Sequence, residues 1–157
     1  MRHRLKEKLI IGGVLVAFLV GAGTSPAFAT SGTGYDGTDP ASTGCATGSV
    51  DIKDVNLYIG GTSTLVGYMQ VRYSPSCGTN WVRVYNIGTS DAVSKTFVQR
   101  PAQGSLPDSG PIGSADAYPG GWAYGPQVYA TGSTCIYAQA GLVTSAWTAW
   151  SSLYYLC

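Results

Sequence analysis

Seven aspartates are the only carboxylate side chains after residue 29. Three of them lie in two short segments whose patterns suggest metal binding or catalysis. Asp36 and Asp39 could hold calcium, but the twelve-position ligand spacing of a calcium loop is absent, and aspartate next to glycine is typical of a turn. Asp108 begins an Asp-Ser-Gly tripeptide, which in two copies lets paired aspartates share a proton and activate water. Pro107 and Pro111 disfavour the strands that such a loop joins. We expect turns in both segments, and an aspartate-dependent hydrolase is kept as an alternative function.

Histidine and glutamate are missing after residue 29, because His3 and Glu7 are the only copies in the chain. Without histidine, the usual serine–histidine and cysteine–histidine nucleophile pairs cannot form, and most catalytic zinc sites lose their imidazole ligands. A serine paired with Lys53 or Lys95 stays open, although nothing near either lysine predicts the burial that makes a lysine a base. We therefore expect a protein that is not an enzyme and that uses neither a metal nor a cofactor.

The first 29 residues have the pattern of a secretory signal peptide. Basic residues stand at positions 2, 4, 6 and 8, an almost wholly apolar run follows from 9 to 22, and Ala-Phe-Ala ends at Ala29. The apolar run is shorter than the roughly 20 residues that a membrane-spanning helix needs. We expect cleavage after Ala29, a secreted, extracellular product, and no membrane span in what remains.

Size and charge restrict the partners of the remaining chain. The 128 residues after Ala29 are enough for one domain with a modest core. They carry five basic and seven acidic side chains, a net charge of −2, and no basic cluster. Because neutralisation of phosphates supplies most of the affinity for nucleic acid, we expect no nucleic-acid partner, and anionic membrane surfaces are disfavoured for the same reason.

All four cysteines lie beyond the expected leader, at Cys45, Cys77, Cys135 and Cys157. In a small exported domain, four cysteines predict two structural disulfides, and no Cys-x-x-Cys pair suggests redox chemistry. Three pairings are possible. We favour Cys45 with Cys77 and Cys135 with Cys157, because each pair then closes its own half of the domain.

Alternating apolar residues predict a mainly β domain over residues 45–157, preceded by an irregular N-terminal arm over 30–44. Ile52 and Val55 are out of phase, which predicts a bulge near Asp54. The stretch 101–121 contains four prolines and many glycines and is expected to be a long surface loop. The fold class is a single small β-sandwich or barrel-like antiparallel domain with two disulfides. The expected extended segments are 55–59, 65–73, 81–87, 95–100, 122–131, 135–143 and 146–157.

Two arginines on neighbouring strands form the first candidate binding region. If Val71 faces Val84 in a hairpin, Arg72 faces Arg83, and like charges opposite each other destabilise a sheet. A nearby carboxylate, a slipped register or an anionic ligand would relieve the repulsion. The carboxylates that could do so are Asp36, Asp39 and Asp51.

The aromatic C-terminal third is the second candidate region, because exposed rings can stack on sugars or on partner proteins. If 146–156 is a strand, Trp147 and Trp150 point to opposite faces, and at most one of them belongs to the core. These features favour a non-enzymatic binding or envelope-associated role, with a carbohydrate-binding module as the first alternative. The partner would be a cell-wall glycan or another extracellular protein. The candidate binding residues are Arg72, Tyr73, Trp81, Arg83 and Trp150.

The segments from Tyr35 to Cys45 and from Val71 to Arg83 resemble the YjfA-like family of exported bacterial proteins, whose domain has no known function. The resemblance covers residues 35–87 well and the remainder loosely. It implies secretion and favours the pairing of Cys45 with Cys77, and it implies no activity. Relatives commonly carry a further cysteine pair before this point, whereas Tyr35 stands here where one of those cysteines would be.

Overall fold

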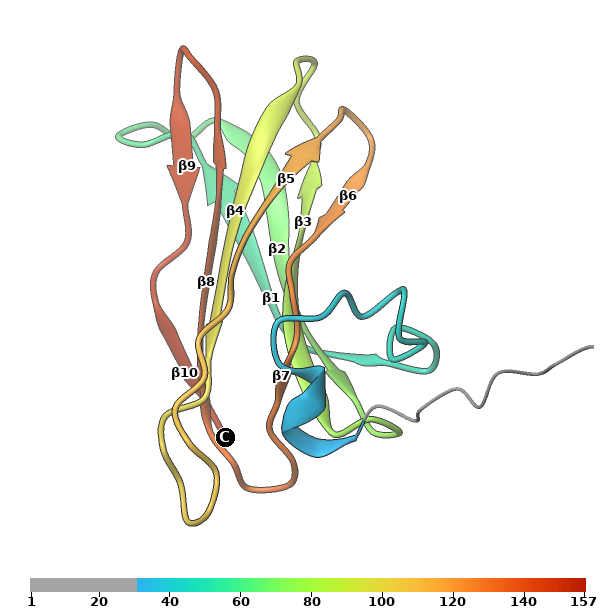
Figure 1. Cartoon of the computed structure of the whole chain (residues 1–157). Helices are drawn as coiled ribbons and strands as arrows, with labels where there is room; N and C mark the ends of the chain where they lie inside the picture. The colour runs from blue at the N-terminus through green and yellow to red at the C-terminus, as the bar shows by residue number, and fades with distance from the viewer. Residues whose placement is uncertain (1–30) are drawn as a thin grey trace, which may run out of the picture.

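The computed structural model describes residues 31–157, which form two antiparallel β-sheets packed face to face (Figure 1). The expected signal peptide and its cleavage point lie outside the described residues. Sheet A contains β1 (Val50–Tyr58), β2 (Leu65–Ser74), β3 (Thr79–Asn86), β6 (Trp122–Tyr124) and β7 (Val128–Tyr129). Sheet B contains β4 (Ala92–Gln99), β5 (Ile112–Ala117), β8 (Ile136–Val143), β9 (Thr148–Trp150) and β10 (Tyr154–Leu156).

The two sheets do not close on each other, so the domain is a β-sandwich and not a barrel. The strand order is β1-β2-β3-β6 in sheet A, with β7 paired to the start of β3, and β10-β8-β4-β5 in sheet B, with β9 paired to β8. The expected mainly β fold is therefore confirmed. No helix in residues 31–157 is long and apolar enough to cross a bilayer.

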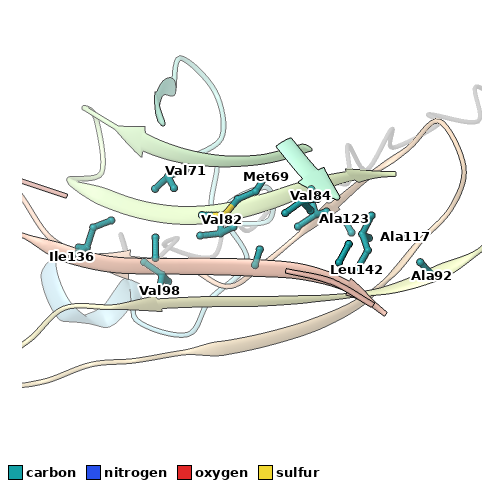
Figure 2. Close-up of a cluster of buried hydrophobic side chains, with 14 of the residues drawn as sticks. Met69, Val71, Val82, Val84, Ala92, Val98, Ala117, Ala123, Ile136 and Leu142 are labelled. Carbon is teal, nitrogen blue, oxygen red and sulfur yellow. The ribbon is translucent and has the colours of Figure 1, made fainter. Parts of the chain in front are cut away.

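Alternation of side chains builds the core between the sheets. Along β4, buried side chains that point into the core alternate strictly with half-buried side chains that point outward. Figure 2 shows the facing residues, with Met69, Val71 and Val82 from sheet A lying against Val98 and Ile136 from sheet B. Burial of these apolar side chains is the main favourable term in the free energy of folding.

The expected long loop over 101–121 is wrong in its second half, where β5 forms the edge of sheet B against β4. Pro111 directly precedes the strand, a position that proline tolerates because no ladder hydrogen bond is lost. Gly113 faces Thr96 so closely that a Cβ atom would overlap the Thr96 hydroxyl. The expected bulge in β1 lies at Ile52, where the register with β2 shifts.

Both disulfides have the favoured pairing, Cys45 with Cys77 and Cys135 with Cys157. The first ties the segment before β1 to the turn between β2 and β3, and the second ties the start of β8 to the residue after β10. Such cross-links are typical of oxidising compartments, so they indicate a non-cytoplasmic environment.

The expected irregular arm extends to the start of β1, and from here on the arm means residues 31–49. An ion pair with the fully buried Arg100 holds it on the sandwich. The arm begins with the 3₁₀ helix η1 (Gly32–Tyr35). Arg100 is fully buried and donates to both carboxylate oxygens of Asp36, from Nη1 at 3.2 Å and from Nη2 at 2.9 Å. Nε donates to Pro107 O at 3.0 Å, and Nη1 donates also to Tyr129 O. One guanidinium therefore joins the arm, the loop after β4, and β7.

A second polar junction fixes the arm beside β3. Gln127 is fully buried, and its amide nitrogen donates to the hydroxyls of Thr38 at 2.9 Å and Thr43 at 2.8 Å. Its amide oxygen accepts from Thr79 at 2.7 Å. In Figure 1 the arm lies beside β7, on the side of sheet A that faces away from sheet B. Trp81 points outward from β3 and is nevertheless only 1% exposed. We infer that the arm covers it, because Thr38 and Thr43 of the arm bind Gln127, which binds Thr79 on the same face of β3.

Replacing Asp36 by alanine is expected to lower the free energy of unfolding by about 3 kcal/mol, because it leaves the buried Arg100 guanidinium without its counter-charge. Urea unfolding followed by circular dichroism measures the loss. Asp39→Ala is the matched control, since Asp39 is exposed and accepts one hydrogen bond from Ala41, and its cost is expected to be below about 1 kcal/mol. Equal costs for the two variants would contradict the ion-pair assignment.

Removing the Cys45–Cys77 disulfide by Cys45→Ala and Cys77→Ser is expected to cost about 3 to 4 kcal/mol and to expose Trp81. The loop closed by Cys135 and Cys157 is of similar length, so its removal is expected to cost nearly as much while leaving Trp81 covered. Denaturant unfolding and the hydrogen exchange of the Trp81 indole measure the two effects. An equal change at Trp81 in both variants would show that the first disulfide does not hold the arm.

Candidate functional site

The outer face of sheet A is divided into a covered half and an open half. Thr79 and Trp81 are buried, whereas Arg83 and Tyr85, further along the same face of β3, are only half-buried. The registers of β1, β2, β3 and β6 align two rows of outward side chains across this open half. One row is Asn56, Tyr68, Tyr85 and Trp122, and the other is Asp54, Gln70, Arg83 and Tyr124.

Four aromatic rings on this open half form what we call the aromatic platform: Tyr68, Tyr85, Trp122 and Tyr124. The ring centroids of Tyr68 and Tyr85 are 6.4 Å apart with an interplanar angle of 26°, and those of Tyr85 and Trp122 are 5.0 Å apart at 54°. Tyr68 is 37% exposed and Tyr124 is 39% exposed. Neighbouring rings at these distances support each other, so the platform is a fixed surface that solvent can reach.

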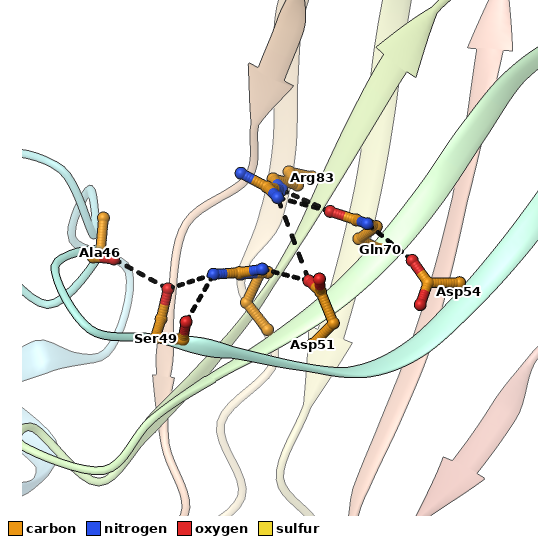
Figure 3. Close-up of polar contacts among 7 residues, drawn as sticks. Ala46, Ser49, Asp51, Asp54, Gln70 and Arg83 are labelled. Carbon is orange, nitrogen blue, oxygen red and sulfur yellow. Dashed lines mark hydrogen bonds and ion pairs between the residues drawn. The ribbon is translucent and has the colours of Figure 1, made fainter.

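Figure 3 shows a chain of polar side chains from Arg83 through Gln70 to Asp54, which belong to the second row. Arg83 donates to Oε1 of Gln70 from Nε at 2.8 Å and from Nη2 at 2.5 Å, and Nε2 of Gln70 donates to Asp54 at 2.6 Å. The Arg83 guanidinium lies 4.0 Å from the ring centroid of Trp122 and 6.0 Å from that of Tyr124. Stacking and hydrogen bonding together hold the guanidinium and the amide in one orientation.

The two arginines do not face each other, because the hairpin register differs by two residues from the expected one. Val71 pairs with Val82, so Arg72 lies opposite Trp81 and Arg83 lies opposite Gln70. A carboxylate is also present, since Asp51 forms an ion pair with Arg72 and lies 4.0 Å from Arg83. Two of the three considered arrangements, the slipped register and the carboxylate, are therefore found together.

Arg72 holds the start of β1 in place and does not belong to the open half. Its Nη2 donates to the carbonyl and to the hydroxyl of Ser49, both at 2.7 Å, as Figure 3 shows. With Asp51 on Nη1, both terminal nitrogens of this guanidinium have partners within the domain. Of the two arginines, Arg83 alone belongs to the rows of the open half.

The other predicted binding residues lie in three separate places. Trp81 is under the arm, so we leave it out of the candidate surface. Tyr73 lines a cavity of about 320 Å³ between the start of β1 and β10, together with Ile52 and Tyr155. Trp150 is 49% exposed on the outer face of sheet B, where it covers Gly141. Trp147 packs against the core, so the two tryptophans have the different environments that we expected.

The aspartates considered for hydrolysis or calcium binding each accept a backbone hydrogen bond. Asp36 accepts from Tyr129 N at 2.7 Å, Asp39 from Ala41 N at 2.7 Å, and Asp108 from Ala102 N. The bond at Asp39 is the turn contact that the sequence predicts. Within residues 31–157, no three potential metal-ligating side chains gather into one group.

Sequence reasoning missed most of the open half. Outward positions on β2 and β3 alternate with the core residues Met69 and Val84, and this signal was available for Tyr68 and Tyr85. The alignment of these tyrosines with Trp122 could not be read from the sequence, because it depends on the pairing of β6 with β3 across a long connection. Chemically, the surface offers ring faces together with an amide, a guanidinium and a carboxylate, which suits a ligand with both apolar faces and hydroxyl groups.

Comparison with known proteins identifies a family for this chain. The family model described as a protein of unknown function, DUF2690, matches residues 33–138, a span that includes the arm and both rows of the open half. No curated protein and no solved structure matches the chain. The chain therefore belongs to the DUF2690 family of proteins of unknown function.

Proposed function

We propose that this chain is an exported, non-enzymatic module that binds a cell-wall polysaccharide on the open half of sheet A. The observation that carries the proposal is the alignment of the aromatic platform with Gln70 and Arg83 on a surface that the arm leaves uncovered. Export from the cytoplasm and the YjfA-like resemblance belong to the same proposal. The two disulfides support export, because they favour an oxidising compartment.

The chemistry of a sugar ring fits this surface. The C–H faces of a pyranose are apolar and pack on aromatic rings, while its hydroxyls both donate and accept hydrogen bonds. The two rows extend across four strands spaced about 4.8 Å apart, so the surface is long enough for more than one sugar unit. A row of rings with adjoining polar groups therefore suits a chain of sugars better than a single small molecule.

The charges favour a neutral glycan over an anionic ligand. Arg72 is paired with Asp51, and Arg83 lies between Gln70 and the aromatic rings with Asp51 nearby. Asp54 adds a negative charge at the end of the same row. Because the positive charges are matched locally, the open half has no excess that would attract phosphate or carboxylate groups.

Replacing Trp122 or Tyr68 by alanine is expected to weaken retention on insoluble cell-wall polysaccharide by about tenfold each, because each variant removes one stacking surface. Pull-down isotherms with the purified exported protein measure the change. Trp150→Ala is the matched control, since Trp150 is an exposed ring on the opposite sheet, and its retention is expected to stay within about twofold.

Circular dichroism and denaturant unfolding establish that each variant is folded. No retention of the unaltered protein would overturn the proposal. Loss of retention in Trp150→Ala with none in Trp122→Ala would place the binding surface on sheet B and overturn the assignment to sheet A.

Retention on the polysaccharide is also expected to change by less than about twofold between low and high salt, at about 0.05 M and 0.5 M sodium chloride. The reason is that stacking and neutral hydrogen bonds are screened little, whereas attraction between an arginine and an anionic group is screened strongly. A steep fall in retention with salt would show that the ligand is anionic and that Arg83 recognises it by charge.

A further inference from the structure

We infer a second binding site, for a ligand that carries a protonated amine, in the cleft at the end of sheet B. This cleft of about 570 Å³ is lined by the segment before β4, the end of β5 and the turn between β8 and β9. These three segments meet at one end of the sandwich, at the top of Figure 1. Its volume is within the range of sites for small ligands, and loops gathered at one end of a rigid sandwich commonly carry binding sites.

The floor of the cleft is a row of the outer face of sheet B. Val93 on β4 pairs with Asp116 on β5 and with Val143 on β8, so the three side chains lie side by side. Two valines thus provide an apolar base, and the carboxylate of Asp116 stands at its edge. This arrangement favours a ligand with a short aliphatic or ring portion beside a polar group.

The charge on the cleft is negative. Asp91 and Asp116 are the two carboxylates that line the cleft, and no lysine or arginine lines it. Neither carboxylate takes part in the three ion pairs found among residues 31–157. Lys95, one row away on β4, donates to Ser114 at 2.9 Å instead. Because both carboxylates line the same cleft, a cation bound there would be attracted by each of them.

Two aromatic side chains, Trp147 and Tyr118, also line the cleft and favour an organic cation over a metal ion. Trp147 packs against the core and is thereby fixed, while Tyr118 is 60% exposed and its hydroxyl lies 3.5 Å from Asp116 Oδ2. An ammonium group gains from a ring face as well as from a carboxylate. A bare metal ion would need more oxygen ligands than these two carboxylates supply, so the geometry fits an organic ammonium group better.

The source of the amine is either a lysine-like side chain or an amino sugar, which share this chemistry. The site is separate from the aromatic platform, because it is built from β4, β5 and the β8–β9 turn and shares no residue with the two rows on sheet A. The inferred amine site can therefore be tested independently of polysaccharide binding on sheet A.

The test is a two-dimensional NMR titration of the full exported protein with Nα-acetyl-lysine methylamide and with the glucosamine disaccharide. We expect saturable shifts at the Trp147 indole and at residues 90–93 and 116–118 with at least one probe. The N-acetylated counterpart of that probe, which lacks the positive charge, is expected to bind at least tenfold more weakly. The probe that binds identifies the source of the amine, and binding of both assigns the shared ammonium chemistry.

Asp91→Asn combined with Asp116→Asn is expected to weaken binding of the same probe at least tenfold. Asp39→Asn combined with Asp108→Asn is the matched control, because it changes the net charge equally, lies outside the cleft and keeps an oxygen for each backbone hydrogen bond. The inference is overturned if neither probe binds, if the N-acetylated counterpart binds equally well, or if both double variants weaken binding to the same extent.

Discussion

The ion pair between Arg100 and Asp36 holds the arm on the sandwich beside the outer face of sheet A. Arg100 has no exposure to solvent, and its hydrogen bonds join the arm to β7 and to the loop after β4. A charge removed from water in this way is tolerated only when it is fully paired, so the arm must stay in place for the domain to be stable. Together with the Cys45–Cys77 disulfide, the ion pair keeps the arm at the half of sheet A where Trp81 is buried. Arg83 and Tyr85 lie on the open half.

The open half of sheet A and the cleft of sheet B differ in chemistry because their surroundings differ. On sheet A, Asp54 and Arg83 of the two rows each have a partner, so the proposed glycan site relies on the rings and the Gln70 amide. In the cleft, Asp91 and Asp116 have no basic partner within it. The proposed glycan site and the inferred amine site therefore lie on different sheets of one small domain.

Local patterns were sufficient for the long central strands and insufficient for the edge strand β5 and for the site. Alternation marked β2, β3 and β8. Of the three possible disulfide pairings, the one that we favoured, in which each pair closes its own half of the domain, is the one found. The edge strand β5 was missed because glycine and proline dominate its surroundings, while its pairing with β4 is tertiary. Exposure of Trp81 could not be judged from its strand, because its cover comes from the arm. Alternation along a strand predicts on which face of the sheet a side chain lies, whereas its exposure to solvent depends on what packs over that face.

Hydrogen exchange of the Trp81 indole N–H tests most directly the claim that the clamped arm divides sheet A into covered and open halves. In the native protein this proton is expected to exchange far more slowly than that of the exposed Trp150. In Asp36→Ala, measured under conditions where the domain remains folded, exchange at Trp81 is expected to accelerate at least tenfold while the core amides stay protected. A Trp81 proton that exchanges as fast as Trp150 in the native protein, or one unaffected by Asp36→Ala, would contradict the account.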